Sequence, residues 1–210
     1  MVTFPFISRH LLEDSGFLGK LKYHYQDPLV VEKLSSGLKE YLWRLNPEHS
    51  RPVVVLGIGT DRSTGDSLGP LVGSKLVSFS DFPASVYGTL EDPVHASNLT
   101  EKLDYIRASF PNPFIIAVDA CLGQVDSVGT ITLSPGALRP GAGVNKVLPA
   151  VGDVHFTGIV NVGGYMEYFV LQNTRLSLVM RMAERIALAI YHGVRQAYGL
   201  NAYPAVQSFQ

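Results

Sequence analysis

The sequence has few of the residues that would link it to a disulfide, a zinc cluster or a membrane. Its single cysteine, Cys121, excludes an internal disulfide bond and a cysteine-rich zinc site. No apolar run approaches the ~18 residues that a membrane-spanning helix needs. The first residues, MVTFPF, lack the basic and apolar regions of a signal peptide. We therefore expect a soluble, cytoplasmic protein without a membrane partner.

An excess of charge of one sign is also missing. The net charge is −1, with 17 Lys and Arg against 18 Asp and Glu. Proteins that bind nucleic acid or anionic membranes usually carry a basic surface, so the balance argues against both. An apolar content of 46% over 210 residues suits one α/β domain with a full core.

What the sequence does contain is a clear strand–loop–helix pattern at residues 53–76. The β-branched run at 53–56 suits a strand buried on both faces, and apolar residues spaced by four follow from Leu68. Gly57 and Gly59 relax the backbone limits where the chain turns. Ligands gather at such carboxyl ends of strands in open α/β sheets, so we expect the functional site here.

Two familiar glycine-rich motifs do not fit this loop. A P-loop has four residues between its glycines and then a lysine, whereas five residues separate Gly59 from Gly65 and Asp66 follows. A dinucleotide-binding fingerprint needs a third small residue where Arg62 stands. An anion would also meet the carboxylate of Asp61. The loop is therefore predicted to offer carboxylates rather than to bind phosphate.

The remaining patterns predict a three-layer α/β/α sandwich of the phosphorylase/hydrolase type. We expect a mostly parallel five-stranded sheet. Its strands should begin near residues 53, 86, 114, 129 and 155. The strand at 129–133 follows its predecessor too closely for a helical crossover, so it is predicted to be antiparallel. Because it alternates, it is interpreted as a half-exposed edge strand.

The domain is expected to span residues 27–210, after an N-terminal extension of residues 1–26 that shows no clear period. Asp27 is the predicted cap of the first helix, which Asn46-Pro47 ends. A long C-terminal helix is expected to bury one continuous apolar stripe. The stripe consists of Leu176, Val179, Met180, Ala183, Ala187, Ile190 and Val194. The loop 134–152, rich in proline and glycine, should border the functional cleft and be among the more mobile segments.

Two aspartates are the leading catalytic candidates. Right-handed crossovers place equivalent strand ends on one edge of the sheet, so Asp66 after the first strand and Asp119 after the third should reach one cleft. Two carboxylates there can act as general acid and base on a water, or can ligate a metal. The structural alternatives are a helix cap for Asp66 and a hydrogen-bonded strand end for Asp119, and on residue type alone capping is the commoner role.

The other candidates have weaker support. His95 and His155 lie near predicted strand or loop ends and could be ligands, although an isolated histidine is more often structural. Cys121 is predicted to be a buried, unactivated thiol because the nearby Asp119 would raise its pKa. Ser63 and Thr64 have no evident base partner, which argues against a serine nucleophile.

The stretch 57–70, GIGTDRSTGDSLGP, resembles the signature of the YyaC family of bacterial sporulation proteins, with similarity over about residues 28–195. The same loop is similar to that of the spore germination protease, as are the segments 115–120 and 140–144. A more distant likeness connects the chain to the hydrogenase maturation endopeptidases, which share the α/β/α fold. These resemblances shift the balance for Asp66 and Asp119 toward a functional site.

The resemblance implies a sporulation-associated protein of the cytoplasm. The two essential aspartates of the germination protease correspond to Asp66 and Asp119. Two functions follow: a peptide-bond hydrolase of narrow specificity, or a non-catalytic protein that binds a peptide or partner in the same cleft. Substrate contacts are expected from the loop residues Gly57, Gly59, Asp61, Ser63, Thr64 and Gly65.

No cofactor, metal or nucleic acid is expected. The hydrogenase endopeptidases add a metal-binding histidine where the last strand passes into its helix, and Asn161 begins that junction here. The predicted partner is a peptide or protein substrate. Assembly into a homo-oligomer is left open.

Overall fold

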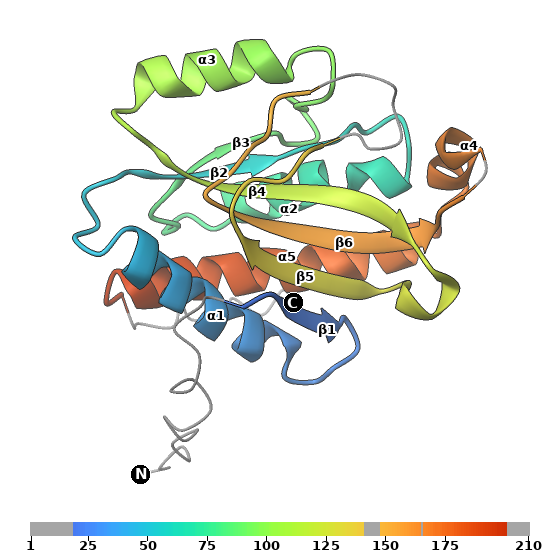
Figure 1. Ribbon diagram of the computed structural model, residues 1–210, viewed down its shortest axis with the longest axis horizontal. Coiled ribbons are helices and arrows are strands. Elements are labelled where there is room, and N and C mark those ends of the chain that lie inside the picture. The colour runs from blue at the N-terminus through green and yellow to red at the C-terminus, as the bar shows by residue number, and fades with distance from the viewer. Residues whose placement is uncertain (1–18, 141–147, 165, 201–210) are drawn as a thin grey trace, which may run out of the picture.

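The computed structural model describes residues 19–140, 148–164 and 166–200. One sheet of six strands, in the order β1-β5-β6-β4-β2-β3, carries helices on both faces (Figure 1). The elements are, in chain order, β1 (Leu21–His24), α1 (Val30–Leu45), β2 (Val53–Gly57), the 3₁₀ turn η2 (Gly65–Ser67), α2 (Leu68–Val77), β3 (Ser85–Tyr87), α3 (Leu99–Ser109), β4 (Phe114–Gly123), the 3₁₀ turn η3 (Val125–Ser127), β5 (Thr130–Pro135), β6 (Val154–Val162), α4 (Glu167–Gln172) and α5 (Leu176–Ala197).

Four neighbouring strands form the parallel part of the sheet. β3, β2, β4 and β6 pair in parallel, and β5 pairs with β6 in the antiparallel direction. This confirms an α/β fold with a mostly parallel sheet and an antiparallel strand after β4. The expected count of five strands was wrong, because β1 pairs antiparallel with β5 and adds a sixth. β1 lies within the segment 1–26, and its four residues are too few to show a period.

β5 is not the half-exposed edge strand that its alternation indicated. β1 covers its outer side, and the polar residues Thr130, Thr132 and Ser134 are 7%, 4% and 8% exposed. Polar and apolar residues alternate along β5, but this alternation does not correspond to exposed and buried positions, because both faces of β5 are covered. The strand is therefore interior to the sheet.

The apolar run of β2 follows from burial on both faces of the sheet. Val53 and Val55 belong to the core shared with α1, α2 and α5. Val54 and Leu56 belong to the core under α3. Figure 1 shows α3 on one side of the sheet and α1 and α5 on the other. The three layers explain why alternation is absent here, as expected for parallel strands covered on both faces.

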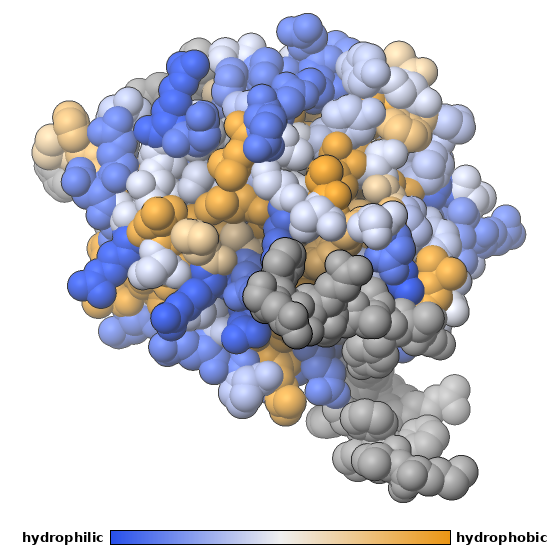
Figure 2. Space-filling view, turned by 180° about the vertical axis from the view of Figure 1, so that it is seen from behind, coloured by the Kyte–Doolittle hydropathy of each residue, from blue (hydrophilic) through white to orange (hydrophobic). Residues whose placement is uncertain are grey.

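Two helix details differ from the sequence-based expectations. α1 begins at Val30, and Asp27 is not its cap: Asp27 Oδ1 accepts a hydrogen bond from the Leu29 N–H at 2.9 Å in the preceding turn. In α5 the predicted stripe is buried except at Leu176 and Met180, which are 55% and 53% exposed. Figure 2, seen from the side on which α5 lies, shows apolar patches among hydrophilic side chains. Thus the inner stripe of α5 starts at Val179.

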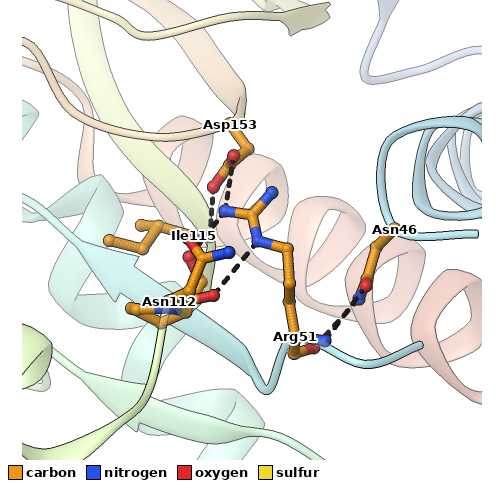
Figure 3. A network of polar contacts seen from close by, with 6 residues as sticks. Asn46, Arg51, Asn112, Ile115 and Asp153 are labelled. Carbon is orange, nitrogen blue, oxygen red and sulfur yellow. Dashed lines mark hydrogen bonds and ion pairs between the residues drawn. The ribbon is translucent and has the colours of Figure 1, made fainter. Parts of the chain in front are cut away.

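A polar network closes the amino edge of the parallel strands (Figure 3). Arg51 donates from Nη2 to Asp153 Oδ1 at 2.7 Å and from Nε to the Asn112 carbonyl at 3.1 Å. Asp153 Oδ2 accepts the Ile115 N–H at 2.8 Å, and Asn46 bonds to the backbone of Arg51 on both its side-chain atoms. The network therefore ties the starts of β2, β4 and β6 together.

None of the helices in the described ranges is both long and apolar enough to cross a bilayer.

Candidate active site

A cavity of about 520 Å³ opens at the opposite, carboxyl edge of the sheet. Its walls come from the loop after β2, the segment before α3, the middle of β4, β6, α4 and both described ends of the loop after β5. Asp66, Asp119 and His95 all line it. The structure thus brings the two candidate aspartates to one cavity, as the strand-end argument predicted, and adds a histidine.

The shape of the loop after β2 requires glycine at position 59. Gly59 has φ +141°, and a Cβ atom there would lie 1.9 Å from the Asp66 carbonyl oxygen. That carbonyl accepts the Thr60 N–H at 3.2 Å, while the Gly59 N–H donates to the Val94 carbonyl at 2.8 Å. The loop therefore folds back on itself and is fastened to the segment that carries His95.

Asp66 lies inside the turn η2, half-buried, and not at a helix cap. The cap position of α2 is Ser67, and no side chain caps this helix. Burial raises the pKa of the Asp66 carboxyl group, while a hydrogen bond from the Thr60 backbone and the charge of His95 act against this rise. The capping alternative is therefore wrong, and the structure leaves Asp66 as a desolvated carboxyl group in a cavity.

Asp119 is 8% exposed and lies within β4, which continues to Gly123 instead of ending before the aspartate. β2 ends one register position earlier, where Gly57 pairs with Val118, so Asp119 still lies just beyond the edge of β2. Its Oδ1 accepts the Ala120 N–H at 2.9 Å. The β4–β6 register shifts between Cys121 and Leu122, and such bulges are common beside functional sites.

His95 is held in the cavity wall by Asn98. Asn98 Oδ1 accepts the His95 N–H at 2.8 Å, and Asn98 Nδ2 donates to the Pro93 carbonyl at 3.0 Å. The ring Nδ1 lies 2.9 Å from Ser97 Oγ. Support for His95 from the sequence was weak, and the available signal was its place after β3, on the same edge of the sheet. Asn98 and Ser97 therefore fix the position of His95 in the cavity wall.

The thiol of Cys121 lines the same cavity but is not activated. The residue is partly buried, whereas a buried thiol was expected. Desolvation, and then the charge of Asp119, raise the pKa of Cys121 to about 11, while a hydrogen bond from Thr157 opposes them. The direction and the contribution of Asp119 match the prediction from sequence. A thiolate nucleophile is therefore unavailable at neutral pH.

The loop residues expected to contact substrate divide into two groups. Gly59 and Ser63 line the cavity, whereas Gly57, Asp61, Thr64 and Gly65 do not. Asp61 is exposed. The glycines have packing roles: a Cβ at position 57 would lie 2.4 Å from the Gly69 carbonyl oxygen, and one at position 65 would lie 2.8 Å from Leu171 Cδ2. Close packing therefore explains why both positions are glycine.

His155 is separate from this site. It lies near the start of β6, at the amino side of the sheet, and its Nδ1 is 2.8 Å from the Gly136 carbonyl oxygen. No group of three or more His, Cys, Asp and Glu side chains suited to a metal ion occurs among the described residues. The described cavity residues thus include no such ligand set, although two carboxyl groups and a histidine line the cavity.

The loop 134–152 borders the cavity, as expected, through Leu138, Arg139, Pro140 and Leu148. A bridge between Leu138 and Val151 holds its base together. Residues 141–147, which include most of the motif at 140–144, lie outside the described residues. The predicted mobility of the loop stays a prediction.

Several lining residues were not predicted because they come from distant parts of the chain. Thr157 is opposite Asp119 in the β4–β6 register. Glu167, Tyr168 and Leu171 enter from α4. The six residues of α4 contain no motif that indicates a role at this site. They reach the cavity because the chain turns after β6.

Comparisons with known proteins identify the family. A family model described as "Protein of unknown function (DUF1256)" matches residues 22–189, and the chain belongs to this α/β family. It is 63% identical to "Uncharacterized protein YyaC" of Bacillus subtilis (strain 168) over 137 residues, 65% of this chain and 67% of that protein. This agrees with the family resemblance of the loop motif.

Among solved structures, the crystal structure of the NiFe hydrogenase maturation protease HycI from Thermococcus kodakarensis KOD1 matches with a TM-score of 0.45 and 19% identity. The match covers 76% of this chain and 99% of that one. A likeness of this size supports no inference about what the present chain binds or cleaves.

Proposed function

We propose that this protein is a narrow-specificity peptide-bond hydrolase in which Asp66 and Asp119 act on a water molecule. The observation that carries the proposal is that one cavity is lined by both carboxyl groups and that burial raises the pKa of Asp66. Perturbed carboxyl groups in a concave site are typical of acid–base catalysis. Asp66 does not cap α2, whereas Asp119 does make the strand hydrogen bond that was its structural alternative.

The two carboxyl groups have different environments, which suits a division of work. In this proposal Asp66, with its raised pKa, is the proton donor, and Asp119 on β4 takes the remaining role of the base. Asp119 takes a proton from water as the water oxygen attacks the peptide carbonyl carbon. Asp66 gives its proton to the leaving nitrogen as the C–N bond breaks, which balances the hydrolysis.

The cavity walls fit a short segment of peptide. A volume of about 520 Å³ lies within the range of roughly 300–1,000 Å³ common for ligand sites. Apolar side chains line it from the loop after β5 (Leu138 and Leu148) and from α4 (Tyr168 and Leu171), while Arg62 and Arg139 contribute exposed cations. Such mixed walls select among sequences, which supports narrow specificity.

The biological setting of the proposal is sporulation, in the bacterial cytoplasm. Its support is the resemblance of the stretch 57–70 to the signature of a family of sporulation proteins and to the loop of the spore germination protease. The substrate in this proposal is therefore a peptide or protein of the sporulating cell. A non-catalytic binding protein with the same cavity is the competing function.

The experiment is to incubate the full chain with extract of sporulating cells and to identify new N-termini by mass spectrometry. New termini that are lost with both Asp66→Asn and Asp119→Asn support hydrolysis. Asp126→Asn is the matched control, because Asp126 is exposed in η3, outside the cavity. Termini that persist in both cavity variants contradict the proposal and leave the binding function.

A further inference from the structure

Ser63, in the same loop as Asp66, has a buried hydroxyl group without a partner. The residue is 7% exposed and lines the cavity. Two buried side-chain polar atoms in the described part of the chain lack a hydrogen-bond partner, Ser63 Oγ and His49 Nδ1. Unpaired buried polar atoms are uncommon because they lose the hydrogen bonds that water would have given them. Each one requires an explanation.

A second serine of the loop shows that its backbone can satisfy a buried hydroxyl group. Ser67 is 6% exposed, and its Oγ donates to the Thr64 carbonyl at 2.7 Å. Ser63, with equal burial three positions before Asp66, has no such acceptor. The difference is therefore specific to the position that faces the cavity.

The missing partner of His49 Nδ1 has a simpler explanation. It lies outside the cavity, its ring packs against Tyr198 with centroids 4.9 Å apart, and its second ring nitrogen can carry the proton. A serine hydroxyl group has no such choice, because it always carries a donor hydrogen. Of these two unpaired atoms, only Ser63 Oγ belongs to a residue that lines the cavity.

We propose that Ser63 Oγ is a substrate-binding group that donates a hydrogen bond to a backbone carbonyl oxygen of a peptide in the cavity. The inference rests on the proposed function for the peptide character of the ligand. On binding, rotation about the Cα–Cβ bond of Ser63 turns the hydroxyl group toward that oxygen. The unpaired donor of the free protein is then satisfied in the complex.

The neighbouring groups favour a carbonyl over a donor as the partner. The Asp119 carboxylate and the carbonyl oxygen of the protonated Asp66 carboxyl group already supply acceptors for N–H groups and water. A backbone segment presents both N–H and C=O groups, so a peptide can use these acceptors and the Ser63 hydroxyl together. Ser63 is not a nucleophile in this scheme, since no bond to Oγ forms.

The test pairs Ser63→Ala with Ser67→Ala, since both remove a hydroxyl group of equal burial from one loop. The full-length variants and the wild-type chain are incubated with a pool of capped random hexapeptides. Peptides that co-elute with the protein, and any cleavage products, are identified by mass spectrometry. Melting temperatures are measured without peptide.

The expected results are opposite for the two variants. Ser63→Ala leaves the melting temperature unchanged or raises it, and it weakens retention of the selected peptides by about two- to tenfold, the worth of one hydrogen bond. Ser67→Ala lowers the melting temperature by about 2–4 °C, because it breaks a bond that is made in the free protein. Its peptide retention stays within about twofold of wild type.

The outcomes separate this inference from the proposed function. Peptides that are retained but never cleaved, with weaker retention by Ser63→Ala, support the role of Ser63 and contradict hydrolysis. Equal retention by Ser63→Ala and wild type overturns the role of Ser63, whether or not cleavage occurs. No retention and no cleavage by the wild-type chain overturns both.

Discussion

The two edges of the parallel strands differ in how completely their polar groups are matched. At the amino edge, Arg51, Asp153 and Asn46 bond to one another or to backbone atoms at the strand starts (Figure 3). At the carboxyl edge, Asp66 is a carboxyl group whose pKa burial raises, and the Ser63 hydroxyl group has no partner. The same sheet thus combines one edge whose polar groups are paired with another whose desolvated and unpaired groups remain available to a ligand.

The largest expected effect tests the carboxyl edge. Asp119→Asn should lower cleavage of the selected substrate at least about 100-fold, because an amide cannot take a proton from water. Its stability should change little, since Asn Oδ1 can still accept the Ala120 N–H. Turnover and urea unfolding of the same preparation check this. A variant that unfolds readily and loses activity in proportion would show that Asp119 is mainly structural.

The second-largest expected effect concerns the amino edge and uses the same substitution of Asp by Asn. Asp153→Asn should lower the free energy of unfolding by about 1–3 kcal/mol, because it removes the charged partner of Arg51 from a partly buried pair. Activity per folded molecule should stay close to wild type. Urea midpoints and cleavage rates at a temperature well below unfolding provide the measurement. Lost activity in a fully folded Asp153→Asn protein would break the contrast between the edges.

The smallest effect concerns the pH dependence of stability at Asp66. A carboxyl group with a pKa raised by burial favours the folded state while it is protonated, and this contribution is lost as pH rises from the unfolded value of 3.8 through the folded value. Asp66→Asn removes the buried charge. The variant should therefore be more stable than wild type at pH 7, and the difference should shrink below pH 4.

The measurement for Asp66 is a set of unfolding curves between pH 3 and pH 8 for both proteins. Asp153→Asn, which breaks the ion pair with Arg51, should be less stable than wild type at pH 7. A stability difference for Asp66→Asn that does not vary with pH would contradict burial of the charged group.

The sequence predicted the strands and the edge of the site better than the details that shape it. β2, β3, β4, β5 and β6 begin within a residue of the expected positions because apolar runs covered by helices leave a local signal. β1 leaves none, since its four residues form a strand only through pairing with β5. Leu176 precedes the buried part of α5, whereas Met180 stands between the buried Val179 and Met182, so its exposure follows from its side of the helix.

At the site, the sequence predicted which strand ends meet. It did not predict which loop residues are in contact with one another. Asp66 and Asp119 follow from the parallel topology alone. His95 reaches the cavity through contacts between distant segments, the Ile58–Val94 bridge and the Asn98 side chain. No local pattern encodes such contacts, and for the same reason the missing partner of Ser63 could not be anticipated.

The continuation of β4 past the end of β2 gives the two carboxyl groups different mechanical supports. Asp119 belongs to a backbone ladder that extends with β6 as far as Gly123 and Val162, whereas Asp66 is carried by a turn between two glycine-containing segments. Backbone atoms in strands move little on the nanosecond timescale. Loops move with larger amplitude, on timescales from nanoseconds to microseconds. Any change in the separation of the two groups during a catalytic cycle must therefore come from displacement of the turn, so amide exchange in residues 60–67 would report it.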